Sequence, residues 1–251
     1  MNTITTQLTS NATQPISEPN HLKQNILSLL LTPNSYFSKK ITNLFYTAEN
    51  VKWKTLLKNV GAPKADEILT YTSSRELRAL YEIASSCSKD AVALEIGSHL
   101  GASSCYIAAG LSKVNGHLFC VDSWQNETMP EGEQNTFSDF RKNIHGLREY
   151  ITPVRKMSND VSNKDVKVPL NLVFIDGDHS YEAVKSDFEL VQKWIAKDGI
   201  IAFHDFSNSD YEGVTRVVGE ALASVDWKLA GYVDTLVWIK PASWTRPIWV
   251  K

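Results

Sequence analysis

From residue 73 onward, short apolar runs alternate with segments of helical periodicity, and this alternation constrains the fold more than any other feature of the sequence. The apolar runs predict strands over residues 91–97, 116–121, 151–156, 172–175 and 200–203. The periodic segments predict helices over residues 73–85, 101–112, 134–144, 181–195 and 213–223. Ser73 and Glu76 predict a capping box at the start of the first of these helices. Strands and helices that alternate at these intervals predict a parallel sheet covered by helices on both faces.

Two further strands are expected near the end of the chain, over residues 228–233 and 236–240. Too few residues separate them for a crossover helix, so they must pair antiparallel. The runs 172–175 and 200–203 are almost continuously apolar, as is typical of strands buried on both faces. The sequence therefore predicts an α/β domain.

The composition is that of an ordinary globular protein. Of 251 residues, 22% are charged and 43% hydrophobic, with a formal net charge of −2, which excludes collagen-like, coiled-coil and wholly disordered classes. No stretch approaches the roughly 18 apolar residues of a membrane span, and residues 1–20 hold no Lys or Arg and no apolar run. We therefore expect a cytoplasmic protein without a membrane or nucleic-acid partner, whose three cysteines are free, buried thiols.

The N-terminal region differs in composition and hydrophobic pattern from the domain that follows. Residues 1–20 are rich in Ser, Thr, Asn and Gln and predict a flexible arm. Residues 21–72 predict a helical cap or lid with two or three short amphipathic helices, punctuated by Pro33 and Gly61. Seven lysines against the single acid Glu49 in residues 21–64 leave two interpretations open, a basic cap over the active site or a solvated lysine face.

The chain ends in a tryptophan-rich segment. Four of the seven tryptophans lie in the last 25 residues, and Pro241 and Pro247 end regular structure there. Residues 242–251 are therefore expected to form a tail that contacts a second copy or an adjoining domain, with core packing as the alternative for Trp227 and Trp238.

The first strand of the domain ends in a glycine turn. Gly97 and Gly101 are spaced G-x-x-x-G, so the second glycine of the dinucleotide fingerprint is missing. Such a turn opens a helix whose N-terminus favours anionic groups, although a plain strand-to-helix turn without ligand has the same pattern. Glu95 favours a ligand site, because a carboxylate in an apolar strand end is costly to bury without a partner.

The ends of the second and third strands carry polar residues that suit a nucleoside. Asp122 follows Gly101 by 21 residues, near the offset at which an acid binds ribose hydroxyls. Its alternative role is a turn or cap before Ser123. Ser158 is placed to bond an adenine edge, or equally to act as a helix N-cap.

Ionisable residues gather at the ends of the fourth and fifth strands: Asp176, Asp178, His179, His204 and Asp205. Such a cluster is costly unless its members pair, bind a cation or transfer protons. Asp176, His204 and Asp205 offer ligands for a divalent metal, and His179 or Asp178 offers a general base. The alternative is that Asp178 or Ser180 caps the next helix and that His204 is satisfied within the sheet.

Three segments resemble class I S-adenosylmethionine-dependent methyltransferases over about residues 73–241: LEIGSHLGAS, VFIDGDHSYEAVKSDFE and GIIAFHDF. More narrowly, they resemble the macrocin-type sugar O-methyltransferases of natural-product pathways. The resemblance implies a Rossmann-like, doubly wound sheet of seven strands with the last strand antiparallel.

The resemblance also implies roles for individual residues. The methionine end of the cofactor would be held by Glu95, Gly97, Ser98, Gly101 and Ser103. The adenosyl end would be held by Asp122, Ser123 and Ser158, with Asp176 also near the cofactor. Asp176, His204 and Asp205 fall at the metal positions, and His179 or Asp178 at the base position. The relatives commonly have an acid where this chain has His204, and an Asp/His/Asp set also accepts softer ions than magnesium.

The expected function is methyl transfer from S-adenosylmethionine to an oxygen of a small-molecule or natural-product acceptor, assisted by a divalent metal, with Mg²⁺ as the first choice. Three alternatives stay open: a metal-independent carboxylate methyltransferase, a metal-dependent phosphoesterase, and a non-catalytic nucleoside-binding module.

Overall fold

The computed structural model describes residues 36–126 and 132–244, with side chains from Thr47 onward. Contacts divide the chain into two units, Met1–Lys52 and Trp53–Lys251. The predicted arm (1–20), the start of the predicted cap and most of the predicted tail lie outside the described residues. The second unit contains the whole sheet and the candidate site.

Helix α2 (Tyr36–Asn59) runs through a region where shorter helices were expected. The prediction of separate helices is wrong here because neither Pro nor Gly occurs between Pro33 and Gly61 to interrupt the hydrogen bonding. The helix ends before Gly61, whose φ of +93° suits a glycine. Trp53 and Leu57, which belong to the second unit, are buried in its core.

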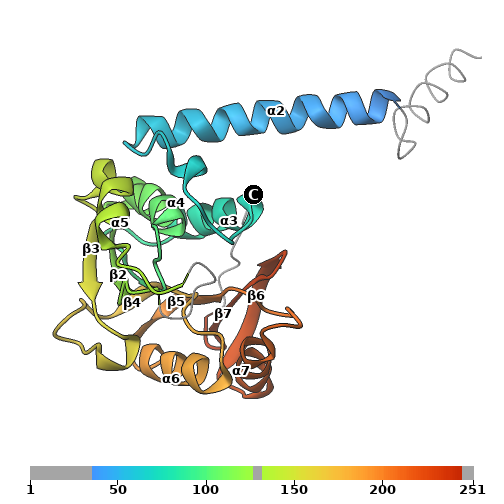
Figure 1. Ribbon diagram of the computed structural model, residues 1–251. Coiled ribbons are helices and arrows are strands. Elements are labelled where there is room, and N and C mark those ends of the chain that lie inside the picture. The colour runs from blue at the N-terminus through green and yellow to red at the C-terminus, as the bar shows by residue number, and fades with distance from the viewer. Residues whose placement is uncertain (1–35, 127–131, 245–251) are drawn as a thin grey trace, which may run out of the picture. The chain divides into compact units, whose positions relative to one another are not determined.

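The sheet has seven strands in the order β3-β2-β1-β4-β5-β7-β6 (Figure 1). The strands are β1 (Val92–Ile96), β2 (His117–Asp122), β3 (Ile151–Arg155), β4 (Leu170–Ile175), β5 (Ile195–Phe203), β6 (Trp227–Val233) and β7 (Leu236–Pro241). Strands β1 to β5 are mutually parallel, whereas β7 is antiparallel to both β5 and β6. This confirms the predicted doubly wound sheet with an antiparallel last strand.

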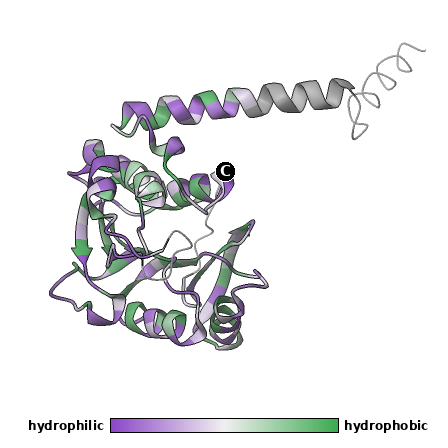
Figure 2. Ribbon diagram, in the orientation of Figure 1, coloured by the Kyte–Doolittle hydropathy of each residue, from purple (hydrophilic) through white to green (hydrophobic). Residues whose placement is uncertain are grey.

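Helices cover both faces of the sheet, as the alternation predicted (Figure 1). They are α3 (Ser74–Ser85), α4 (Ala102–Leu111), α5 (Phe137–Asn143), α6 (Tyr181–Val191) and α7 (Glu212–Ala223). One core joins α3, α4 and α5 to residues such as Phe174, and the other joins α6 and α7 to residues such as Phe203. Hydrophilic and hydrophobic residues alternate along α6 and α7 in Figure 2, as expected for helices that bury one face against a sheet.

Helix α3 begins as the sequence predicted. Ser73 accepts a hydrogen bond from the backbone of Glu76, and the Glu76 carboxylate accepts one from the backbone of Ser73, which is a complete capping box.

Two predicted helix boundaries are wrong. Helix α6 ends at Val191 rather than near Ile195, because the chain there joins the sheet: the Leu170 N–H donates to the Trp194 carbonyl at 2.8 Å, and Ile195 pairs with Leu170. Helix α5 starts at Phe137 rather than at Gln134, since the backbone N–H of Gln134 instead donates to the carbonyl of Gln125. Tertiary pairing overrides local periodicity in both places.

Candidate active site

A cavity of about 1000 Å³ lies at the carboxyl ends of the parallel strands. In an open α/β sheet this is the edge at which ligands bind. Most of the sequence-predicted site residues line it: Gly97, Ser98, Gly101, Ser103, Asp122, Ser123, Ser158, Asp176, Asp178, His179, His204 and Asp205. The structure therefore brings these residues together around one space large enough for a nucleoside and a second small molecule.

The glycine turn after β1 has the backbone conformation that the sequence indicated. Gly97 and Gly101 have φ values of +87° and +88°, which side chains rarely adopt. A Cβ atom at Gly97 would overlap the backbone of Asp176, and one at Gly101 would crowd the ring of Phe140. Both glycines are required by close packing, and α4 begins directly after Gly101.

Glu95, expected at the cofactor, is fully buried and does not line the cavity. Its carboxylate accepts a short hydrogen bond from the hydroxyl of Ser104 and one from the Cys120 thiol at 3.3 Å. Burial raises the pKa of Glu95, and the hydrogen bonds of Ser103 and Ser104 oppose that rise. Glu95 therefore adjoins the cavity through Ser103 rather than facing it directly.

Asp122 serves the turn after β2 while also lining the cavity. Its two carboxylate oxygens accept hydrogen bonds from the backbone of His99 at 2.8 Å and of Trp124 at 2.6 Å. The indole of Trp124 in turn donates to the His99 carbonyl at 2.9 Å. Asp122 thus ties the loop after β2 to the loop after β1, so the turn role and the ligand role proposed for it are compatible.

Ser158 is the first residue of the short 3₁₀ turn η4 (Ser158–Asp160), whose N-cap is Met157, so the N-cap role that the alternative gave to Ser158 is wrong. It bonds instead to Asp187, a buried residue of α6 that also lines the cavity. Burial raises the pKa of Asp187 to about 6, with a further rise from Asp178 and an opposing effect of Ser158. Sequence reasoning missed Asp187, although an acid between Val184 and Phe188 on the inward face of α6 is a visible signal.

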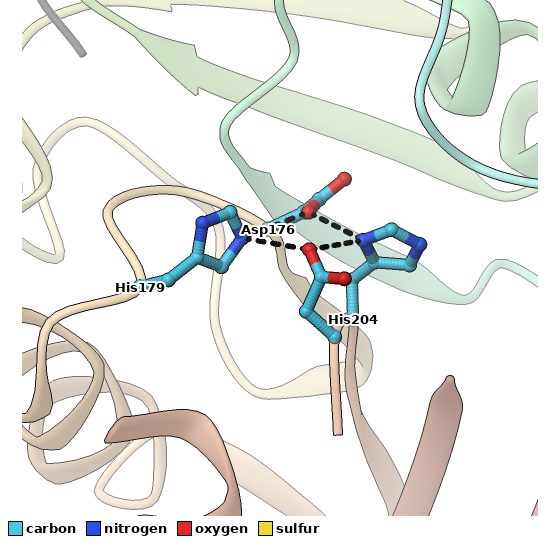
Figure 3. A group of neighbouring side chains, drawn as sticks. Asp176, His179 and His204 are labelled. Carbon is cyan, nitrogen blue, oxygen red and sulfur yellow. Dashed lines mark hydrogen bonds and ion pairs between the residues drawn. The ribbon is translucent and has the colours of Figure 1, made fainter. Parts of the chain in front are cut away.

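Four of the five ionisable residues after β4 and β5 converge on one point, as Figure 3 shows. His204 Nδ1 lies 3.1 Å from Asp176 Oδ1 and 3.1 Å from Asp205 Oδ2. His179 Nε2 lies 3.5 Å and 3.3 Å from the same two oxygens. We call these four residues the His/Asp cluster; their four facing atoms all lie within 4.8 Å of one another.

His204 is buried and surrounded by acids. Its Nε2 lies 3.4 Å from Glu76 Oε2, a contact that sequence analysis did not foresee. Burial lowers the pKa of His204, but Asp176, Asp205 and Glu76 together raise it to about 12. His204 is therefore held by carboxylates on both ring nitrogens.

Asp178 and Ser180 have the local roles that the alternative interpretation gave them. The Asp178 carboxylate accepts a hydrogen bond from the Ser180 backbone at 2.7 Å, and Ser180 is the N-cap of α6. Asp178 is nevertheless exposed and lines the cavity, so it is available to a ligand as well.

Residues 94–206 match the family model described as a methyltransferase domain. The matched segment is 113 of the 251 residues, less than half of the chain. It carries every cavity residue from the glycine turn to Asp205, whereas Glu76 comes from outside it.

A curated relative is an uncharacterized protein of Acanthamoeba polyphaga mimivirus, 44% identical over 80 residues. The match covers 30% of this chain and about a third (34%) of that protein. Among solved structures, an O-methyltransferase from Bacillus cereus in complex with SAH is 16% identical with a TM-score of 0.53, covering 87% of this chain and 97% of that one.

Two further solved structures are similar. The O-methyltransferase TomG of Streptomyces achromogenes, involved in tomaymycin synthesis and in complex with SAM, is 15% identical with a TM-score of 0.52 over 75% of this chain and 90% of that one. The calicheamicin methyltransferase CalS11 is 15% identical with a TM-score of 0.50 over 93% and 99%. At 15–16% identity, these similarities show the fold alone.

No helix in the described part of the chain has the length and apolar character needed to cross a membrane.

Proposed function

We propose that this chain transfers the methyl group of S-adenosylmethionine to an oxygen atom of a small-molecule acceptor, with assistance from a divalent ion. One observation carries the proposal: a single cavity joins the glycine turn, Asp122 and the His/Asp cluster. A nucleoside-binding half and an acid–base half thus share one space.

The chain's own residues fit S-adenosylmethionine. Gly97 and Gly101 line the cavity on the first loop, at the N-terminus of α4. The amide Nδ2 of Asn126 lines the same cavity and has no hydrogen-bond partner among the described residues, so it can donate to a ligand. We assign Asp122 to the ribose, and Ser158 with Asp187 to the adenine side, because all three line the same cavity.

The residues also fit a divalent ion. Asp176, His204 and Asp205 present oxygen and imidazole donors to one point, which is the donor chemistry of a metal site. A metal bound there lowers the pKa of an acceptor hydroxyl.

The reaction needs the acceptor oxygen to be aligned and deprotonated. When bound, S-adenosylmethionine supplies a methyl group on a cationic sulfur, and its carbon–sulfur bond breaks as the carbon–oxygen bond forms. The cavity walls hold the two reactants in line, which accounts for much of such a rate. The hydroxyl proton passes to His179 or Asp178, which both line the cavity.

The acceptor is proposed to be a natural product with an apolar or aromatic part. Four exposed residues with large apolar side chains also line the cavity and give its rim an apolar character: Leu69, Tyr71, Met157 and Tyr211. Among the similar structures, TomG is involved in tomaymycin synthesis and CalS11 is a calicheamicin methyltransferase, which is consistent with this class.

Calorimetry with S-adenosylhomocysteine tests the proposal. Wild type should bind one equivalent, and Asp122→Asn should bind about 10-fold or more weakly, because it loses the charge that accepts the ribose hydroxyls. Asp160→Asn is the matched control: Asp160 is exposed, close by in η4 and not part of the cavity lining. Failure of wild type to bind would refute the proposal, and phosphate release from phosphoesters in its place would favour the phosphoesterase alternative.

A further inference from the structure

We propose that His179 is a fourth metal ligand rather than the general base, that Glu76 positions His204 as a ligand, and that this set selects a transition ion of the zinc class over magnesium. The inference deepens the metal part of the proposed function and concerns the same cavity. It begins from His179, whose ring nitrogen Nε2 is buried and has no hydrogen-bond partner among the described residues.

The position of His179 Nε2 is that of a ligand. It faces Asp205 Oδ2 and Asp176 Oδ1, the same two atoms that face His204 Nδ1, at four distances of 3.1 to 3.5 Å. A tetrahedral ion with bonds of about 2.0–2.1 Å separates neighbouring ligand atoms by about 3.3 Å. Four of the six distances among these ligand atoms therefore match the spacing that one small ion requires, and all six are within 4.8 Å.

The donor types decide between ions. Magnesium prefers oxygen ligands and retains several waters, whereas imidazole suits zinc, iron, cobalt and nickel. Two of the four donor atoms here are imidazole nitrogens. Counting His179 as a ligand changes the donor set from two oxygens and one nitrogen to two of each, which favours the transition ions.

Glu76 gives His204 the outer contact that metal-binding histidines generally have. A ligating imidazole usually donates its other N–H to a carboxylate, which fixes the ring and its tautomer. His204 Nε2 lies 3.4 Å from Glu76 Oε2, on the side away from Asp176 and Asp205. Glu76 is a positioning residue in this arrangement, because it acts on the ion only through His204.

Glu76 is itself held rigidly. Its Oε1 accepts hydrogen bonds from the backbone and the hydroxyl of Thr235, both at 2.8 Å, and its Oε2 accepts one from the Ser73 backbone at 2.8 Å. The Asp205 carboxylate is similarly fixed, since its Oδ1 accepts a hydrogen bond from Asn208 at 2.8 Å. Tyr211 packs against the His179 ring, with centroids 4.3 Å apart. The cluster is thus preorganised by residues outside it.

One consequence concerns the base. In the metal-loaded site His179 Nε2 is engaged by the ion and cannot accept the acceptor's proton. Asp178, which lines the cavity but lies outside the cluster, is then the proton acceptor.

Metal binding to the chelator-treated full-length protein tests the inference. Zn²⁺, Co²⁺ and Mg²⁺ are titrated separately, and bound metal is counted by elemental analysis after gel filtration. We expect one Zn²⁺ or Co²⁺ per chain at concentrations at which Mg²⁺ does not bind. The visible spectrum of the Co²⁺ protein should show the strong bands of four-coordinate cobalt.

Two variants distinguish the ligand role of His179 from the positioning role of Glu76. His179→Ala should lose the bound ion and the strong cobalt bands, whereas Glu76→Gln should weaken binding by about 10- to 100-fold and keep them. His117→Gln and Glu82→Gln are matched controls that should bind as wild type, since neither residue lines the cavity. Circular dichroism checks that each variant is folded. Ser73→Ala is the control for Glu76→Gln, because it weakens the same helix cap without removing the Glu76 carboxylate.

Two results with metal bound would overturn the inference: tight binding of Mg²⁺ alone, or wild-type metal affinity in His179→Ala. Binding of no ion at all would also overturn it, because the His/Asp cluster would then be an ion-pair network around a charged His204. Binding of S-adenosylhomocysteine is measured on the same preparations. Nucleoside binding without any metal would refute this inference and the metal assistance, and would leave methyl transfer from S-adenosylmethionine standing. Metal binding without nucleoside binding would refute the proposed function alone.

Discussion

Gly97 packs directly against the backbone of Asp176, so that a Cβ atom at Gly97 would overlap the Asp176 carbonyl oxygen. Gly97 follows β1 and Asp176 follows β4, which are neighbouring parallel strands. The glycine turn and the first residue of the His/Asp cluster are therefore one packed unit, and a change in either must displace the other.

Gly97→Ala tests this contact. The positive φ alone should lower the free energy of unfolding by about 1–3 kcal/mol, and the overlap adds to that loss. Urea denaturation measures the change. Gly219→Ala is the control, since Gly219 lies within α7 and a Cβ there meets no atom within 4 Å; it should stabilise by about 0.4–1 kcal/mol. A Gly97→Ala protein as stable as wild type would contradict the packing described.

Asp187 should make stability depend on pH. Its folded pKa of about 6 lies above the value of about 3.9 in an unfolded chain, so the folded state binds the proton more tightly. The contribution of Asp187 to the free energy of unfolding is fully present below pH 4. It is lost as the pH rises through 6, by up to about 3 kcal/mol.

Asp187→Asn cannot ionise and should escape that loss. Its stability relative to wild type should therefore increase between pH 4 and pH 7, as measured by urea denaturation at several pH values. A difference that stays constant over this range would mean that Asp187 has an ordinary pKa in the folded protein.

Glu95→Gln asks whether Glu95 touches the cofactor. Because Glu95 does not line the cavity, we expect this variant to reduce the affinity for S-adenosylhomocysteine less than Asp122→Asn does. Calorimetry on the two variants under the same conditions gives the comparison. A larger loss in Glu95→Gln would restore the direct contact that the sequence suggested.

Trp53→Ala tests the end of α2 that belongs to the second unit. The Trp53 ring packs edge-on against Tyr81, with centroids 5.0 Å apart, and its side chain is buried. Truncation should cost about 3–5 kcal/mol of unfolding free energy. Lys58→Ala, on an exposed position of the same helix, should stay within about 0.5 kcal/mol of wild type. Equal effects of the two substitutions would show that Trp53 is not part of the core.

The sheet, the glycine turn and the ionisable cluster were predicted from local patterns, because the residues that form each strand end and turn are neighbours in the sequence. Ser98, Ser103 and Ser123 were named only through the family resemblance. The capping box at Ser73 and Glu76 was predicted from neighbouring residues as well. The second role of Glu76 was not, since its partners His204 and Thr235 lie far along the chain and share no local pattern with it. The end of α6 was missed similarly, because pairing of Ile195 with Leu170 depends on the assembled sheet.

The hydrogen bonding of Glu76 has a consequence for how this protein can change. One carboxylate initiates α3 and also orients His204, so any replacement at that position affects folding and chemistry simultaneously. A better helix cap cannot be acquired there without a penalty at the cluster. Mutational tolerance at residue 76 should accordingly be narrower than at other helix starts in the chain, even though it lies outside the segment that resembles known methyltransferase domains.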